Sequence, residues 1–369
     1  MDVPDFRWSS ARQYLPFDLD GFSVEHGALV RRRGVEGGEA LVRALLLVGL
    51  PNSSLERASK MACEAGLAKM NTTAMFKRLC RSEAMLQALF VHTLGHAVDI
   101  GERWGGLRLL AVDGTSLCGP GAKGANQILH TVYDLGRGLP VSVDLTGPEG
   151  GEALWRHRSF GFGDLVLGDR GYGYNRSFHW ALRSGARILV RFNFVTVTLL
   201  DETGARITAE AADARVPDSG TVELKVEIPE WPGPLRAVGA RNPKGESVWL
   251  LTDLSQEELP TDDVRELYRR RWQVELFFKR LKSLLDLGDL PSRDGPTTRA
   301  WIWAKLLLAS LAVLLAHERF SPWGHEEPLE VLRLRGLGAL QGAACTHDTT
   351  EAGKAERKTQ TARSNAQAA

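Results

Sequence analysis

The spacing of apolar residues in the first third of the chain predicts helices. Between Gly37 and about Leu94, apolar residues recur every three or four positions, so each expected helix has one face suited to burial. Ser53, with Glu56 three residues later, has the spacing of a capping box at the start of one of these helices. We therefore expect a helical domain in this part of the chain.

Two of the expected helices are joined by the short connection GLAKMN, which is typical of a helix-turn-helix. The second helix would present Lys77, Arg78 and Arg81, where they could contact DNA. Helix pairs with surface lysines are also common in proteins that bind no DNA, so this motif alone leaves both interpretations open.

After Gly106 the pattern changes to short apolar runs, which predict strands. LRLLAVD and DLVLG read as buried strands, and QILHTVYDLGRGLPVSVDLTG between them reads as a hairpin. From Arg187 to about Asp253, four further β-like segments are separated by turns such as NPKG. A helix follows the segment ELPTDD, so we expect an α/β protein.

That helix contains YRRRWQVELFFKRLK, from Tyr268 to Lys282, in which six basic residues surround one carboxylate, Glu275. An α-helix turns by about 100° per residue, so Tyr268, Arg271, Glu275 and Lys282 fall within one narrow stripe beside an apolar face. The simpler interpretation is an amphipathic surface helix with Glu275 and Lys279 as an ordinary pair, worth a few tenths of a kcal/mol.

Two aspartates stand at the ends of the expected buried strands: Asp113 in LLAVDGTS and Asp169 in LVLGDRGYG. Each one alone could be a turn residue, because Asp-Gly is a common turn pair. Crevices at strand ends are also where ligands bind in α/β sheets. If Asp113, Asp169 and Glu275 converge, the three carboxylates would suit a hard cation such as Mg²⁺ or Mn²⁺.

The composition of the chain limits which binding partners and which cellular compartment can be expected. The net charge is only +1, so a nucleic-acid partner must be sought in local basic clusters. The four cysteines show neither metal-binding nor disulfide spacing, as expected in a reducing cytoplasm. We see no signal peptide, and the apolar stretch from Ala300 to Ala316 is short and contains Lys305, which favours a buried helix over a membrane span.

Tyr268, Arg271, Glu275 and Lys282 reproduce the Y-x2-R-x3-E-x6-K signature of a family of bacterial insertion-sequence transposases. The chain resembles the IS-four type, which carries a DDE triad on an RNase H-like fold. AVDGTS is similar to the first aspartate segment of that family, and LGDRGYG is similar to the second. The resemblance covers residues from about 107 to 282 closely and the helical N-terminus loosely.

This resemblance implies a metal-binding catalytic triad of Asp113, Asp169 and Glu275. The triad would hold two Mg²⁺ ions, with Mn²⁺ as an alternative. It also implies a cut-and-paste transposase that binds terminal inverted repeats and target DNA, pairs two ends as a homodimer, and has no membrane partner. We expect such an enzyme in the bacterial cytoplasm, associated with the nucleoid.

The resemblance further implies residues that contact DNA. Tyr268, Arg271 and Lys282 would contact phosphates near the cleaved end, with arginine as a two-pronged donor and lysine as a point charge. Relatives that cut through a hairpin intermediate hold a flipped base on an inserted tryptophan. Trp249 and Trp272 are the candidates here, although tryptophans in strands usually pack in the core.

Pattern and resemblance together divide the chain into five parts. Residues 1–100 are expected to form the helical N-terminal domain, and 101–186 the first part of an RNase H-like mixed-sheet core. Residues 187–255 are expected to form a β-rich insertion, 256–343 the second part of the core, and 344–369 a disordered tail.

Two other classes of protein remain open. A metal-dependent RNase H-like nuclease would need the triad, but neither the tryptophans nor a paired complex. A catalytically dead DNA-binding remnant of a transposase would keep DNA affinity in the presence of a chelator. A zinc protease is excluded because HTLGH has threonine where that motif needs glutamate, and the chain has no ATPase phosphate loop.

Overall fold

The chain forms two compact units, which are described separately. Unit 1 consists of Met1–Thr93 and Pro296–Ala369, and unit 2 is Leu94–Gly295. The computed structural model describes residues 8–97, 103–150, 160–292 and 295–319. The expected disordered tail, residues 344–369, lies outside the described residues.

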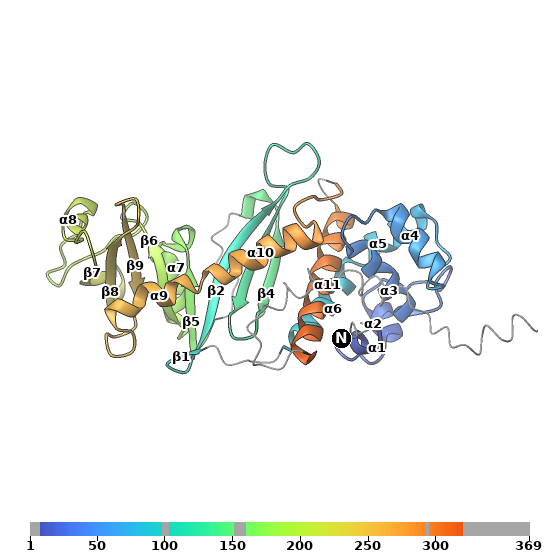
Figure 1. Ribbon diagram of the computed structural model, residues 1–369, viewed down its shortest axis with the longest axis horizontal. Coiled ribbons are helices and arrows are strands. Elements are labelled where there is room, and N and C mark those ends of the chain that lie inside the picture. Colours follow the sequence, from blue (N-terminus) through green and yellow to red (C-terminus); the bar gives the residue numbers. More distant parts are fainter. Residues whose placement is uncertain (1–7, 98–102, 151–159, 293–294, 320–369) are drawn as a thin grey trace, which may run out of the picture. The chain divides into compact units, whose positions relative to one another are not determined.

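Unit 1 is helical, as the apolar spacing predicts (Figure 1). Its helices are α1 (Trp8–Arg12), α2 (Leu19–Glu25), α3 (Gly38–Gly49), α4 (Leu55–Glu64), α5 (Thr72–Arg81), α6 (Glu83–Leu94) and α11 (Pro296–Arg319). α4 begins one residue later than the capping box predicts. Ser54 accepts a hydrogen bond from the Arg57 amide at 3.1 Å, whereas the Ser53 hydroxyl donates to the Leu47 carbonyl at 2.7 Å.

Helix α11 packs against α3 and α5, so it belongs to the helical unit and not to the core segment 256–343 in which the sequence placed it. Its apolar residues surround the whole helix, and such a helix is stable only when other elements cover every side. Lys305 is 1% exposed, with its ammonium over the ring of Trp301 and 3.3 Å from the Gly49 carbonyl. Among the described residues only Pro296–Ala316 is long and apolar enough to span a membrane, and the prediction of a buried helix there is confirmed.

Unit 2 contains a nine-stranded mixed sheet (Figure 1). Its strands are β1 (Arg103–Trp104), β2 (Leu107–Leu117), β3 (Gln127–Asp134), β4 (Leu139–Thr146), β5 (Asp164–Gly168), β6 (Arg187–Phe192), β7 (Thr221–Ile228), β8 (Trp231–Arg241) and β9 (Ser247–Thr252). The order is β4-β3-β2-β5-β6-β9-β8-β7, with β1 paired to β2. Among the strand pairs of the described residues, only β2–β5 and β5–β6 are parallel.

The β-rich segment 187–255 does not form a sheet of its own. β6 pairs in parallel with β5, and β9 then continues the same sheet by pairing antiparallel with β6. β2 is also longer than expected, because it continues past Asp113 to Leu117 while pairing with β3. The expectation that Asp113 ends a strand is therefore wrong, since antiparallel pairing supports β2 after its parallel pairing stops.

Helices cover both faces of this sheet: α7 (Asn175–Arg183), α8 (Ala209–Asp213), α9 (Val264–Arg269) and α10 (Trp272–Leu285). Leu110 and Val112 of β2 join a core cluster with Phe178 of α7. Side chains alternate along a strand, so Asp113 faces the opposite side of the sheet from these residues. On that side the ring of Tyr133, which is paired with Ala111, lies 5.1 Å from the ring of Phe277 of α10. The sheet therefore presents Asp113 towards the helix that carries the basic stripe.

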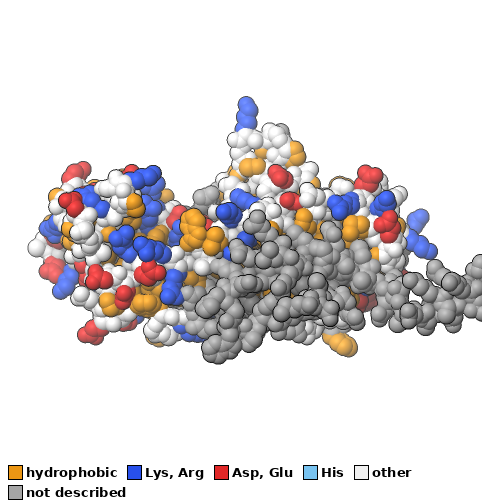
Figure 2. Space-filling model, viewed as in Figure 1, with side chains coloured by type: hydrophobic (Ala, Val, Ile, Leu, Met, Phe, Trp, Pro, Cys, Tyr) orange, Lys and Arg blue, Asp and Glu red, His pale blue; other side chains and the backbone are white. Residues whose placement is uncertain are grey.

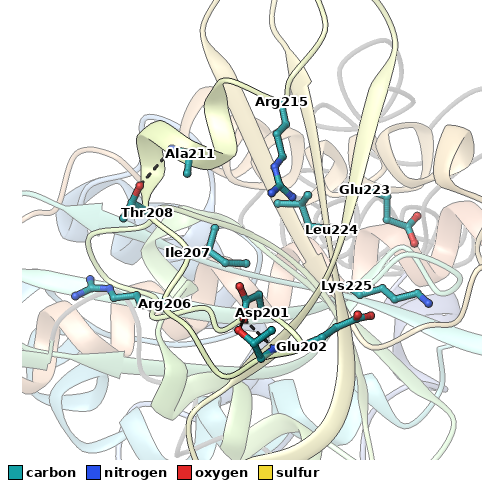
Figure 3. Close-up of a pocket in the computed structure, with 11 residues that line it drawn as sticks. Asp201, Glu202, Arg206, Ile207, Thr208, Ala211, Arg215, Glu223, Leu224 and Lys225 are labelled. Carbon is teal, nitrogen blue, oxygen red and sulfur yellow. Dashed lines mark hydrogen bonds between the residues drawn. The ribbon is translucent and has the colours of Figure 1, made fainter.

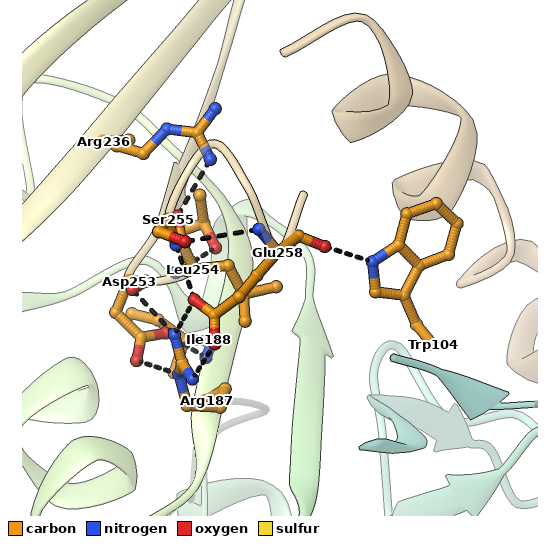
Figure 4. Close-up of polar contacts among 9 residues, drawn as sticks. Trp104, Arg187, Ile188, Arg236, Asp253, Leu254, Ser255 and Glu258 are labelled. Carbon is orange, nitrogen blue, oxygen red and sulfur yellow. Dashed lines mark hydrogen bonds and ion pairs between the residues drawn. The ribbon is translucent and has the colours of Figure 1, made fainter. Parts of the chain in front are cut away.

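A polar network anchors the loop between β9 and α9 (Figure 4). Arg187 donates to Asp253 at 2.7 Å and makes two hydrogen bonds of 2.8 Å to the carboxylate of Glu258. The indole of Trp104 donates to the Glu258 carbonyl at 2.9 Å. The bonds from Arg187 are the largest cause of the depressed pKa of Glu258, which falls to about 2.

The same loop is held from β8 by Arg236, which is almost fully buried. Its guanidinium binds both carboxylate oxygens of Glu223, at 2.8 and 2.7 Å. It also donates to the carbonyls of Leu254 and Leu259, at 2.8 and 2.9 Å. The start of α9, and with it the tyrosine of the stripe, is thus fixed to the sheet by buried charge-assisted bonds.

Candidate active site

The stripe residues lie on two helices, so the prediction of one continuous helix is wrong. α9 ends at Arg269 and α10 begins at Trp272. Across the junction, the amide of Arg271 bonds to the carbonyl of Tyr268 at 3.1 Å, three residues back. In such a tight turn residues three apart eclipse each other, so Tyr268 and Arg271 still share one side. The Arg271 guanidinium carbon lies 5.8 Å from the centre of the Tyr268 ring.

The two aspartates directly follow the last parallel pair of the neighbouring strands β2 and β5. The parallel register between β2 and β5 ends with Val112 opposite Gly168. Asp113 and Asp169 are the next residues on the two chains. Asp169 then accepts a hydrogen bond from the Gly171 amide at 2.9 Å, and the chain turns into a 3-10 helix. The two positions therefore become neighbours through strand pairing, not through closeness in sequence.

Electrostatic coupling shows that the third acid is also near. The pKa of Asp113 is raised to about 6, mainly because burial disfavours its charged form. Asp169 and Glu275 raise it further by like-charge repulsion, whereas Arg271 and the Gly114 amide lower it. The structure therefore brings the three carboxyls predicted from sequence within electrostatic reach of one another.

Arg271 bridges two of the three acids. One of its nitrogens lies 3.5 Å from Oδ2 of Asp113, and another contacts Oε1 of Glu275. All three side chains are at least two-thirds buried, so the guanidinium is held among them and not in solvent. In this conformation a guanidinium cation therefore already lies between the two carboxylates.

A cleft of about 570 Å³ opens beside this cluster. Asp113 and Glu275 line it together with Lys279 and Lys282 of α10. The Lys282 ammonium lies 3.3 Å from the Ser116 carbonyl of β2. The cleft thus combines acids that suit a hard cation with lysines that suit a phosphate.

Lys279 was missed as a site residue, because the sequence paired it with Glu275. In the structure Glu275 pairs with Arg271, and Lys279 faces the cleft. The signal was present in the sequence, since Lys279 lies about 20° from Tyr268 on the helical wheel and so belongs to the same stripe.

The three carboxylates have the right chemistry for a divalent ion, since such ions take oxygen ligands. Within the described ranges, however, no three acidic, histidine or cysteine side chains are already close enough together to hold a metal ion. The bridge through Arg271 offers a physical reason, because its guanidinium lies between Asp113 and Glu275. The donor set is thus of the chemical kind that suits such an ion, with the Arg271 guanidinium between two of its members in this conformation.

The two candidate tryptophans differ in exposure. Trp249 is 4% exposed, and its indole donates to Asp213 at 2.8 Å. A Cβ atom on Gly239 of the neighbouring strand would lie 2.7 Å from the Trp249 ring, so the ring packs directly on backbone. The expectation that Trp249 holds a base is therefore corrected: it is a core residue. Trp272, at the start of α10, is 57% exposed.

The two DNA-contact candidates on α5 also differ. Lys77 is exposed, as predicted. Arg78 is directed inward, and its guanidinium donates to the carbonyls of Ala28, Arg31 and Arg33. The expectation of a direct DNA contact by Arg78 is corrected, because three of its five N–H groups already donate to carbonyls within unit 1.

Comparison with known proteins decides the family. Residues 104–311, more than half of the chain, match the family described as "Transposase DDE domain". The chain belongs to this DDE transposase family. The matched segment contains the three acids and the whole basic stripe.

Relatives of this DDE transposase include putative transposase InsL of insertion sequence element IS186A from Escherichia coli K12. The two are 28% identical over 349 residues, which cover 84% of this chain and 94% of InsL. The transposase of insertion sequence element IS421 from Escherichia coli is also 28% identical, over 350 residues. The chain is thus a DNA transposase of the insertion-sequence type, an enzyme that cleaves DNA and transfers strands.

A solved structure shares the fold of this transposase. The piggyBac transposase, in a synaptic complex with hairpin DNA determined by cryo-EM, superimposes with a TM-score of 0.53. The match covers 96% of this chain and 85% of the piggyBac chain at 10% sequence identity, so it concerns the fold alone.

Proposed function

We propose that Asp113, Asp169 and Glu275 together bind two Mg²⁺ ions in a cut-and-paste transposase, with Mn²⁺ as an alternative. The observation that supports this most is geometric: Asp113 and Asp169 follow the last parallel pair of β2 and β5, and Arg271 contacts both Asp113 and Glu275. The strand order β4-β3-β2-β5-β6, with two parallel pairs beside an antiparallel meander, supports an RNase H-like core.

The ions would supply activation of an attacking oxygen and stabilisation of the departing one. The protein side chains would place the DNA strand. Lys282 and Lys279 border the cleft, where they would act as point charges for phosphates. Arg271 would present its planar fork to a single phosphate. When Arg271 moves to a phosphate, it also leaves Asp113 and Glu275 available as ligands.

The reaction would then proceed by in-line displacements at phosphorus. Water first replaces a 3′ oxygen at the transposon end, and the leaving oxygen takes up a proton as the free 3′ hydroxyl. That hydroxyl next attacks the opposite strand, forms a hairpin and displaces the 3′ oxygen of the flanking DNA. A second water then opens the hairpin and regenerates the free 3′ hydroxyl. This hydroxyl finally attacks a phosphorus of target DNA and displaces a 3′ oxygen there. Each step exchanges one phosphorus–oxygen bond for another, so no oxidant or nucleotide cofactor is needed.

Trp272 would offer its exposed ring to a base extruded near the cleaved end. The partners would be terminal inverted repeats and target DNA, bound by two copies of the chain that pair two ends. Such an enzyme would work on the bacterial nucleoid.

The test is cleavage of a duplex that carries the DNA flanking the gene of this chain. Asp113→Asn should abolish cleavage in Mg²⁺ while DNA binding persists. Glu266→Gln, at an exposed side chain of α9, should cleave like the wild type. If Asp113→Asn still cleaves, the metal assignment fails. Cleavage without joined products would identify a nuclease, and binding without any cleavage a transposase remnant.

A further inference from the structure

Unit 1 contains a basic groove that no catalytic role explains. It has a volume of about 920 Å³ and lies between the loop before α3 and helix α5. Its cationic lining consists of Arg31, Arg33, Lys69, Lys77, Arg78 and Arg81. We propose that this groove holds the phosphate backbone of a DNA duplex, a proposal that rests on the chain being a transposase.

The walls of the groove are fixed to each other through their backbones. Val35 forms a bridge with Ala68, and the Lys69 amide donates to the Gly34 carbonyl at 2.8 Å. Gly34 has φ of +78°, and a Cβ atom there would lie 2.8 Å from the Lys69 carbonyl oxygen. Only glycine fits this approach, so the two loops are held together in advance of any ligand.

Arg78 fixes the arginine-rich loop from inside. Its guanidinium donates to the Ala28 carbonyl at 3.4 Å, to the Arg31 carbonyl at 2.5 Å and to the Arg33 carbonyl at 3.0 Å. Because these three carbonyls accept from one guanidinium, the loop is curled around it. Arg31 and Arg33 are exposed. Arg78 is thus a positioning residue, and its neighbours in the loop are the contacts.

Five exposed cations remain for a ligand: Arg31, Arg33, Lys69, Lys77 and Arg81. Within the described chain, none of these five side chains forms a hydrogen bond or an ion pair, and no acidic side chain lines the groove. Such a cluster in a chain of net charge +1 is a local excess that attracts a polyanion.

A pocket in unit 2 differs from this groove because basic and acidic side chains line it together. There Arg206, Arg215 and Lys225 lie among Asp201, Glu202 and Glu223, so the charges balance (Figure 3). The visible surface over β7, β8 and β9 is similarly mixed, with basic and acidic side chains side by side (Figure 2). The groove of unit 1 therefore differs from this pocket in the sign of its net charge as well as in its shape.

Duplex DNA fits this groove because it carries one negative charge about every 1.7 Å along its axis. Several cations spread along an open groove can each meet a different phosphate, and phosphate contacts carry no sequence information. The groove should therefore contribute affinity equally to transposon-end DNA and to unrelated DNA. Base recognition would have to come from other residues.

The experiment measures duplex binding against salt concentration, with the full chain in EDTA so that no strand is cut. Removing two groove cations, in Arg31→Ala/Arg33→Ala, should reduce the slope of log affinity against log salt by about 1.8, since each contact contributes about 0.9. The matched control Arg57→Ala/Lys60→Ala removes two exposed cations of α4 outside the groove and should leave the slope unchanged. Equal slopes for the two double variants would overturn the proposal.

The role of Arg78 is tested by Arg78→Gln. Hydrogen exchange of the amides in 30–35 should become faster, and the Arg31→Ala/Arg33→Ala pair should cost less affinity in this background. The positioning role is refuted if Arg78→Gln leaves amide exchange in 30–35 unchanged and the Arg31→Ala/Arg33→Ala pair costs the same affinity in this background as in the wild type. All binding is measured in EDTA, so the result does not depend on whether the chain cleaves DNA. If an RNA duplex of equal length binds more tightly through the same residues, the proposed occupant is wrong.

Discussion

Replacing Trp272 by alanine should weaken the protein–DNA complex without unfolding the protein. The ring is 57% exposed, so its loss should change the free energy of unfolding by no more than about 0.5 kcal/mol. Stacking of a base on an aromatic side chain is worth about 1–3 kcal/mol. The expected loss is therefore about 5- to 140-fold in affinity for a cleaved end, at about 1.4 kcal/mol per factor of ten.

The assay is a double-mutant cycle between protein and DNA. Duplexes carry a single abasic site, moved one position at a time along the nucleotides at the cleaved end. If Trp272 holds an extruded base, Trp272→Ala should cost affinity on intact DNA and almost nothing on the duplex that lacks that base. Trp272→Tyr should retain most of the affinity, since tyrosine still offers a stacking face.

Trp249 provides the contrasting variant. Trp249→Ala should cost about 3–5 kcal/mol of stability, because it empties a buried site and leaves Asp213 without its indole donor. The reasoning is refuted if Trp272→Ala lowers affinity equally on intact and on every abasic duplex. It is also refuted if Trp272→Ala has no effect on affinity.

Three further outcomes follow from the polar contacts. Arg236→Ala should lower the free energy of unfolding, measured by urea titration, by about 3–5 kcal/mol, because Glu223 and two buried carbonyls lose their donor. A loss below about 1 kcal/mol would contradict this. Glu258→Gln should destabilise the protein at neutral pH. The pKa of Glu258 is depressed from its ordinary 4.5 to about 2 in the folded state, so the charged form stabilises the fold above pH 4.5 and this stabilisation is lost as pH falls through about 2. The difference in free energy of unfolding between wild type and variant should therefore shrink over that range. A constant difference would argue against the bond from Arg187. Arg271→Gln should raise the Mn²⁺ affinity of the DNA-free protein about tenfold while lowering cleavage. The reason is that the single charge of Arg271 and the double charge of Mn²⁺, about 6 Å apart in water, repel by ~1.4 kcal/mol. Weaker Mn²⁺ binding would show that Arg271 does not compete with the ion.

Local pattern was sufficient for most elements of the fold. Helices α3 to α6 and α11 of unit 1, the strands β2 to β9 and the helical stripe follow from apolar spacing and turn residues, whereas α1 and α2 lie before the segment predicted as helical. The pairing of strands was not available from local pattern, because it depends on contacts between distant segments. Spacing alone could not show that Asp113 and Asp169 follow the last parallel pair of β2 and β5.

The corrected expectations have tertiary causes. Trp249 and Trp272 look alike in sequence, but neighbouring elements bury the first and leave the second open. Arg78 has the spacing of a surface cation, yet three carbonyls of a distant loop occupy its donors. Helix α11 belongs with α3 and α5 because only a helical environment covers all of its apolar sides.

The most direct test of the proposed metal site is a Mn²⁺ titration followed by electron paramagnetic resonance, with the protein bound to cleaved-end DNA. Asp113→Asn, Asp169→Asn and Glu275→Gln should each weaken Mn²⁺ binding by at least about tenfold, consistent with the loss of one charged ligand. Glu266→Gln should bind Mn²⁺ like the wild type. Wild-type affinity in any one of the three triad variants would contradict a shared site for these carboxylates.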